Sequence, residues 1–138
     1  MFYWIDSTAR LAYINLRGPL TDFGRLLQLF DSLFANPQWQ PDMAIVEDLR
    51  ELTEQPPSTC IAEWRRYLQE RRFVLPRQWA LVLRPVASPR LRAIMAAAAA
   101  DAAGCNLSMQ LFTSMCDAHA WLARRDTRTP FGHGIGGA

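Results

Sequence analysis

The stretch that decides the fold of this chain is Gln78-Trp79-Ala80-Leu81-Val82-Leu83, which is followed shortly by Ser88-Pro89. The run from Trp79 to Leu83 is apolar without interruption, which is typical of a central strand covered on both faces. Ser88-Pro89 is a strong helix start, because proline is preferred at the first position of a helix. That helix is expected to run to Gly104, a natural C-terminal stop. A buried strand followed by a helix is the repeating unit of an α/β fold.

The same alternation extends to both sides of this unit. Aromatic, β-branched and apolar runs predict further strands at residues 2–5, 10–16, 43–46 and 107–112. Apolar residues at helical spacing, preceded by capping residues, predict helices that begin near Thr21, Ser58 and Ser114. The order is therefore ββαβαβαβα. It indicates an α/β fold with a mostly parallel sheet, whose first strand is antiparallel because Asp6-Ser7-Thr8 forms a hairpin turn.

The chain is expected to form one domain. Residues 1–125 carry all the predicted elements, and a chain of 138 residues is long enough to bury a core of its own. Residues 126–138 are glycine-rich and are expected to be disordered. The sequence contains no internal repeat.

Composition indicates a cytoplasmic protein with no nucleic-acid or membrane partner. Half of the residues are apolar, a fifth are charged and the net charge is only +2. All 15 basic residues are arginine, which we attribute to biased codon usage rather than to an anion site. Three cysteines with no CxxC spacing argue against a disulfide framework or a structural zinc site. The N-terminus lacks the features of a signal peptide, and no apolar run approaches the length of a membrane span.

Five short stretches carry a resemblance to a known family. They are Tyr13-Ile14-Asn15-Leu16-Arg17-Gly18, Asn36-Pro37-Gln38-Trp39-Gln40-Pro41, Val46-Glu47-Asp48-Leu49-Arg50, Trp79-Ala80-Leu81-Val82 and Ala118-His119-Ala120-Trp121-Leu122. In their joint order, from Leu11 to Leu122, the chain resembles the STAS domain of sulfate transporters and anti-sigma-factor antagonists. It is most similar to the stand-alone bacterial branch of small, uncharacterised antagonist-like proteins.

The resemblance implies a sheet of successive β-α turns, with the first strand antiparallel beside the second. It also implies a protein that binds partner proteins, or in distant relatives apolar ligands, and that is not an enzyme. The best-known antagonists carry a phosphorylatable serine in an Asp-Ser-Ser-Gly-like turn at the start of the second helix. In this sequence the residues after Asp48 form a longer, acidic, proline-containing loop without that motif. A phosphorylation switch of the family type is therefore not expected.

Asp48 and Arg50 are the first candidates for binding a ligand or a partner. They follow the strand at 43–46 at its C-terminal end, where open α/β sheets commonly bind ligands. A carboxylate and a guanidinium at this position can orient a polar ligand or a partner loop. The alternative is a local ion pair that closes the strand.

Two further strand-to-helix junctions contain candidate residues. Arg84, Ser88, Arg90 and Arg92 surround a helix start, where backbone amides and arginines favour an anion. An N-terminal cap and a solvated helix face explain the same residues more simply. Ser58 and Thr59 can accept a phosphate at a helix N-terminus, although ordinary capping is the more common role of such residues.

Cys116 and His119 are three residues apart on a predicted helix, and so can share a face. A thiol and an imidazole can form a nucleophile and base, or two metal ligands. The sequence supplies neither a third ligand nor an orienting carboxylate, so we predict no metal site, no catalytic residue and no cofactor. The glycine-rich, P-loop, nucleophile-elbow and zinc-helix motifs are also absent.

The aromatic residues are the remaining feature of the sequence. Core packing accounts for them most simply, and an apolar pocket or a dimer face is the alternative for Trp39, Trp64, Trp79 and Trp121. If the crossover helices gather on one side of the sheet, the apolar residues on both faces of 80–83 predict self-association or a pocket.

We therefore predict a non-enzymatic regulatory module that binds an unknown protein partner, acts in bacterial signalling and forms a homodimer. An alternative is a carrier of a small, apolar, lipid-like molecule. A more remote alternative is an enzyme that uses Asp48, Arg50 or the pair Cys116 and His119.

Overall fold

The computed structural model describes residues 1–124 and has the predicted order of elements. The strands are β1 (Phe2–Asp6), β2 (Leu11–Pro19), β3 (Ala44–Glu54), β4 (Gln78–Val82) and β5 (Ser108–Phe112). The helices are α1 (Phe23–Ala35), α2 (Cys60–Glu70), α3 (Pro89–Ala103) and α4 (Met115–Ala123). The predicted fold class is confirmed, because β1 is antiparallel to β2 and the other neighbouring strands are parallel. The predicted disorder of 126–138 lies outside the described residues.

Side chains at the helix starts satisfy backbone amides that have no partner within the helix. The Asp22 carboxylate accepts from the Arg25 amide at 3.3 Å, and the Ser88 hydroxyl accepts from the Leu91 amide at 3.1 Å. Ser114 caps α4 in the same way. Helix α2 differs from the sequence prediction, because Thr59 occupies the capping position but its side chain makes no capping hydrogen bond.

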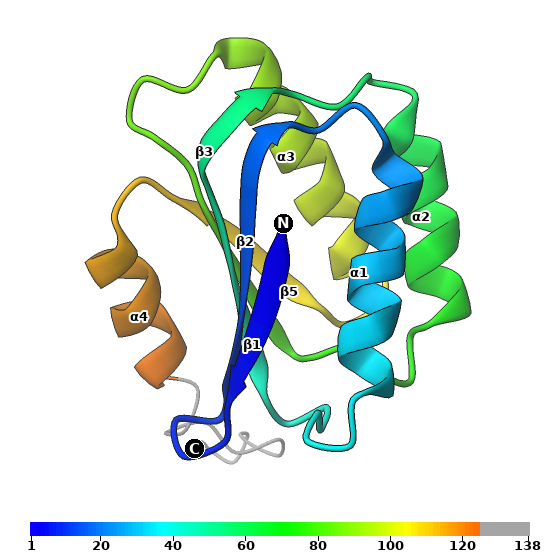
Figure 1. Cartoon of the computed structure of the whole chain (residues 1–138), viewed down its shortest axis with the longest axis vertical. Helices are drawn as coiled ribbons and strands as arrows, with labels where there is room; N and C mark the ends of the chain where they lie inside the picture. Colours follow the sequence, from blue (N-terminus) through cyan, green and yellow to red (C-terminus); the bar gives the residue numbers. More distant parts are fainter. Residues whose placement is uncertain (125–138) are drawn as a thin grey trace.

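The five strands lie side by side in the same order as in the chain, so every crossover moves in one direction across the sheet. Right-handed crossovers that move in one direction place their helices on the same face. Helices α1, α2 and α3 accordingly pack on one face, and α4 lies alone on the other (Figure 1). We call these the three-helix face and the α4 face.

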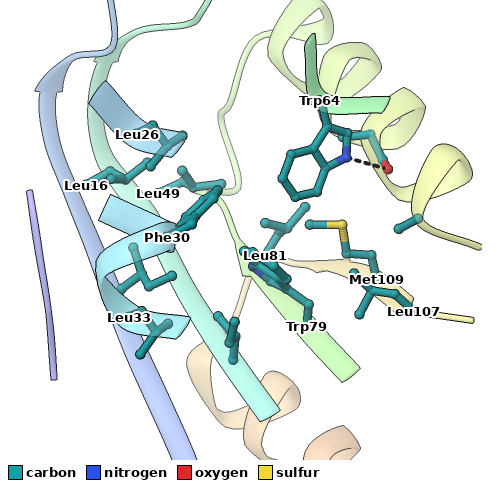
Figure 2. Close-up of a cluster of buried hydrophobic side chains, with 14 of the residues drawn as sticks. Leu16, Leu26, Phe30, Leu33, Leu49, Trp64, Trp79, Leu81, Leu107 and Met109 are labelled. Atoms are coloured by element: carbon teal, nitrogen blue, oxygen red, sulfur yellow. Dashed lines mark hydrogen bonds between the residues drawn. The ribbon is translucent and has the colours of Figure 1, made fainter. Parts of the chain in front are cut away.

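Three aromatic rings form the centre of the core on the three-helix face (Figure 2). The Trp79 ring of β4 is fully buried between Phe30 of α1, at 5.1 Å between ring centroids, and Trp64 of α2, at 5.6 Å. Both contacts are edge-to-face, the geometry that aromatic quadrupoles favour. The Trp64 indole also donates to the Ala98 carbonyl of α3 at 3.1 Å. The rings therefore connect all three helices to the sheet.

The α4 face has a smaller core of its own. Ala80 and Val82 of β4 are fully buried there, in one cluster with Val46 of β3 and with Trp121 and Leu122 of α4. The apolar residues on both faces of β4 are thus covered within the chain. Self-association is not needed to cover this strand, because α4 crosses to the face that α1, α2 and α3 leave open. The homodimer stays a prediction.

Replacing Trp121 tests the importance of this second core. We expect Trp121→Ala to lower the free energy of unfolding by about 3 kcal/mol, because it removes a large side chain that packs on Phe112. Urea unfolding followed by circular dichroism measures the change. Cys116→Ala, at an exposed position of the same helix, is the control and should change stability by less than about 0.5 kcal/mol. Equal effects of the two substitutions would contradict this account of α4.

Candidate functional site

Three aromatic side chains stand in a row on the α4 face, from the exposed edge strand to the margin of α4. Phe2 and Trp4 of β1 are stacked at 5.8 Å between centroids, and Trp4 is stacked on Tyr13 of β2 at 4.8 Å. Phe2 and Trp4 are 46% and 47% exposed, although β1 is an ordered strand. We call Phe2, Trp4 and Tyr13 the aromatic strip. Exposed, contiguous aromatic surface of this kind is typical of interaction sites.

The predicted pair Asp48 and Arg50 lies beside the aromatic strip. The sheet register places Phe2 opposite Asn15, and Asn15 opposite Asp48. Arg50 donates to both oxygens of the Asp48 carboxylate, from Nε and Nη2 at 2.9 Å each. Burial alone would raise the pKa of Asp48, but the hydrogen bonds from Arg50 and the charges of Arg50 and Arg17 outweigh it and hold the pKa below its usual range. The pair is a closed local ion pair at the polar end of the strip.

The residues predicted around the start of α3 are mostly engaged in forming the loop. Ser88 caps the helix, and the Arg92 guanidinium donates to the carbonyls of Pro85 at 2.7 Å, Ala87 at 3.3 Å and Arg84 at 3.4 Å. The arginine that organises this junction is thus Arg92, one of the four residues that the sequence placed around it. Arg90 instead lines a surface hollow of about 370 Å³. Anion binding by Arg84, Ser88 and Arg90 stays a prediction.

The remaining predicted residues are distributed over separate elements. Ser58 and Thr59 are exposed at the start of α2, and their modification stays a prediction. The His119 ring packs on Tyr13 at 5.8 Å between centroids, with 3.5 Å from its Nε2 to the Tyr13 hydroxyl, while Cys116 is exposed. Within residues 1–124 there is no group of three His, Cys, Asp or Glu side chains placed to hold a metal ion. Over the same residues, no helix combines the length and the apolar character of a membrane span.

Glu47 is the ionisable group that sequence reasoning missed. It lies at the centre of β3 on the three-helix face, with Ile14 and Leu81 as its neighbours on the adjoining strands, and it is 4% exposed. Its Oε1 accepts from the Trp79 indole at 2.9 Å. Loss of contact with water raises the pKa of the Glu47 carboxyl to about 7, against the opposing effect of this hydrogen bond.

A small cavity adjoins the Glu47 carboxyl. It has a volume of about 40 Å³, lies between the sheet and α1, α2 and α3, and is bounded otherwise by apolar side chains and the Cys60 thiol. The half-buried residues Phe23, Ile61 and Met95 form its outer rim. The cavity shares Leu20 and Pro56 with the larger hollow that contains Arg90. Buried carboxyls with raised pKa values in clefts are typical of functional sites.

Comparisons with known proteins identify the fold. No family model matches the chain, and no curated protein matches it. Among solved structures, the chain is similar to an uncharacterised protein of the DUF3478 family from Shewanella loihica PV-4, which has a SpoIIAA-like fold. The TM-score is 0.53 and the identity 15%, over 81% of this chain and 83% of that chain. The protein therefore has a SpoIIAA-like fold, which is the STAS-like fold expected from the sequence.

The pH dependence of stability tests the environment of Glu47. Its pKa is 4.5 in an unfolded chain and about 7 in the folded protein, so the folded state prefers the protonated carboxyl. The stabilising contribution is full below pH 4.5 and is lost as the pH rises through 7. We expect a loss of about 2–3 kcal/mol between pH 5 and pH 8.

The variant Glu47→Gln keeps an acceptor for Trp79 but cannot ionise, so it should lack this loss. Subtracting its urea-unfolding profile from that of the unsubstituted protein removes the contributions of other groups. The pKa values of Asp31 and Asp48 are lowered, so these two groups change the stability only at more acidic pH. Parallel profiles of the two proteins between pH 5 and pH 8 would refute the environment described for Glu47.

Proposed function

We propose that this protein is a non-enzymatic regulatory module that works by protein–protein contact, and that the aromatic strip binds a second copy of the chain. The observation that carries the proposal is the exposure of Phe2 and Trp4, stacked side by side on an ordered strand. A soluble monomer gains nothing by leaving such a surface in water, whereas an interface buries it.

The position of β1 favours a second copy as the occupant. β1 is an edge strand, because within residues 1–124 it pairs only with β2. An edge strand can pair antiparallel with the same strand of another copy about a twofold axis. That arrangement would extend the sheet and bring the Trp4 side chains of both copies to one surface. The ion pair of Asp48 and Arg50 would lie at the polar margin of the interface, where charged groups are usual.

Other observations support the proposal of a non-enzymatic protein of the bacterial cytoplasm. The solved neighbour is bacterial, and the SpoIIAA-like fold is typically non-enzymatic. The three cysteines are unpaired and one of them, Cys116, is exposed, which favours a reducing cytoplasm. A role in bacterial signalling follows from the resemblance to anti-sigma-factor antagonists and is part of the proposal.

Self-association is tested by native mass spectrometry and analytical ultracentrifugation over a range of protein concentrations. We expect a dimer for the unsubstituted protein and a monomer for the double variant Phe2→Ser, Trp4→Ser. Both side chains are half exposed, so the variant should keep its fold, which circular dichroism verifies. Phe73→Ser, at a position that is 82% exposed on another surface, is the matched control and should remain dimeric.

Two results would count against the proposal. A protein that stays monomeric at all concentrations would exclude a second copy as the occupant of the strip. A dimer that survives the double substitution as well as it survives Phe73→Ser would place the interface on another surface.

A further inference from the structure

Glu47 is a buried carboxyl that has no cationic partner among residues 1–124. Its hydrogen bond within residues 1–124 comes from the neutral Trp79 indole, whereas an ionised carboxylate can accept several. Within the same residues, none of the basic side chains lines the cavity beside it. Buried carboxylates are ordinarily paired with a cation or hydrogen-bonded by several donors. The carboxyl group therefore has unused hydrogen-bonding capacity within the described residues, and Glu47 lines the cavity.

The cavity has the size and lining for one particular kind of group. Its volume of about 40 Å³ admits a group as large as one or a few water molecules, so an ammonium and its first methylenes fit. Phe30, Leu81 and Met109 bound the interior, and Ile61 and Met95 stand at the rim, all of them apolar. An unbranched hydrocarbon chain matches this apolar lining between the interior and the rim, and the flexible Met95 side chain can adjust to it.

From this complementarity we propose that the cavity is a binding site for a small primary alkylamine, whose ammonium pairs with Glu47 and whose hydrocarbon chain lies between α1, α2 and α3. The site lies on the three-helix face and shares no residue with the aromatic strip. It gives the protein a ligand in addition to the proposed protein contact. The chain contains no lysine, so it has no side-chain amine that could occupy the site in the ligand's place.

The protonation state of Glu47 would control how tightly the cavity binds the amine. A primary ammonium stays charged below about pH 10, as a lysine side chain does, so changes between pH 5.5 and pH 8 report on the carboxyl. Because the pKa of Glu47 is about 7, amine affinity should increase about tenfold for each unit by which the pH rises toward 7, and level off above pH 7. The Cys60 thiol, the other titratable group of the cavity, has a raised pKa and stays neutral in this range.

Asp31, an acidic residue on α1, does not compete with Glu47 for the ammonium. On α1 and α2, Asp31 is engaged by Arg71 and by the Tyr67 hydroxyl, at 3.0 Å and 2.8 Å. The residues of α3, β2, β4 and β5 that face Glu47 or line the cavity are Ile94, Met95, Ala98, Ile14, Trp79, Leu81 and Met109, none of which titrates. Glu54 and Arg90 lie farther out, in the adjoining hollow.

The test is titration with n-hexylamine, followed by the indole N–H signal of Trp79 in nitrogen-15 NMR and by thermal unfolding. At pH 8 we expect hexylamine to shift the Trp79 signal and raise the melting temperature, with an affinity more than tenfold higher than at pH 5.5. Hexan-1-ol, which has the same chain without charge, should bind more weakly and without pH dependence. Hexanoate should not bind at pH 8, because it would face the ionised Glu47.

Three variants complete the experiment. Glu47→Gln should reduce hexylamine affinity at least tenfold at pH 8 and abolish its pH dependence, while hexan-1-ol binding stays unchanged. Ala98→Leu, which fills the cavity, should block both ligands, whereas Ala96→Leu, at an exposed position of the same helix, should block neither. The proposal is overturned if hexylamine leaves the Trp79 signal unmoved, binds Glu47→Gln as tightly as the unsubstituted protein, or binds no better than hexan-1-ol at pH 8.

Discussion

The hydrogen bond between the Trp79 indole and the Glu47 carboxyl is the interaction around which this core is arranged. Trp79 packs against Phe30 and Trp64, and so it joins β4 to α1 and α2. An indole N–H buried at that depth needs an acceptor, and the neighbouring strand supplies one. The ring that connects the helices to the sheet therefore also explains why a side chain with an acceptor oxygen is buried on the neighbouring strand.

The second organising constraint is the unequal cover of the two sheet faces. Chain-order strands place α1, α2 and α3 on one face, which leaves α4 to cover the other. One short helix covers β4 and its nearest neighbours but not β1. Phe2 and Trp4 are therefore exposed by topology and not by local sequence. The cavity on the three-helix face and the exposed aromatic strip on the α4 face result from the same arrangement.

The sequence predicts most of the fold because its signals are local. The apolar run of β4, the Ser88-Pro89 helix start and the order of elements each depend on a few adjacent residues. No local signal predicts on which face of the sheet α4 packs, because the spacing of its apolar residues does not identify the surface against which they pack. Glu47 was within reach of sequence reasoning, since alternation along β3 places it on the same side as Ile45 and Leu49, both of them buried. Exposure of Trp4 depends on which strand lies at the edge, and so on the whole topology.

The chain-order arrangement of the strands has a consequence for synthesis on the ribosome. Each strand that emerges can pair with the strand before it, so the sheet grows in one direction. Pairing of consecutive strands also keeps the entropic cost of closing each connection low. The α4 face does not share this advantage. Ala44, Val46, Ala80 and Val82 are covered only when α4 has left the exit tunnel and can fold onto them. A stalled or truncated nascent chain that lacks α4 would present this apolar surface to other chains, and such chains are natural clients of chaperones.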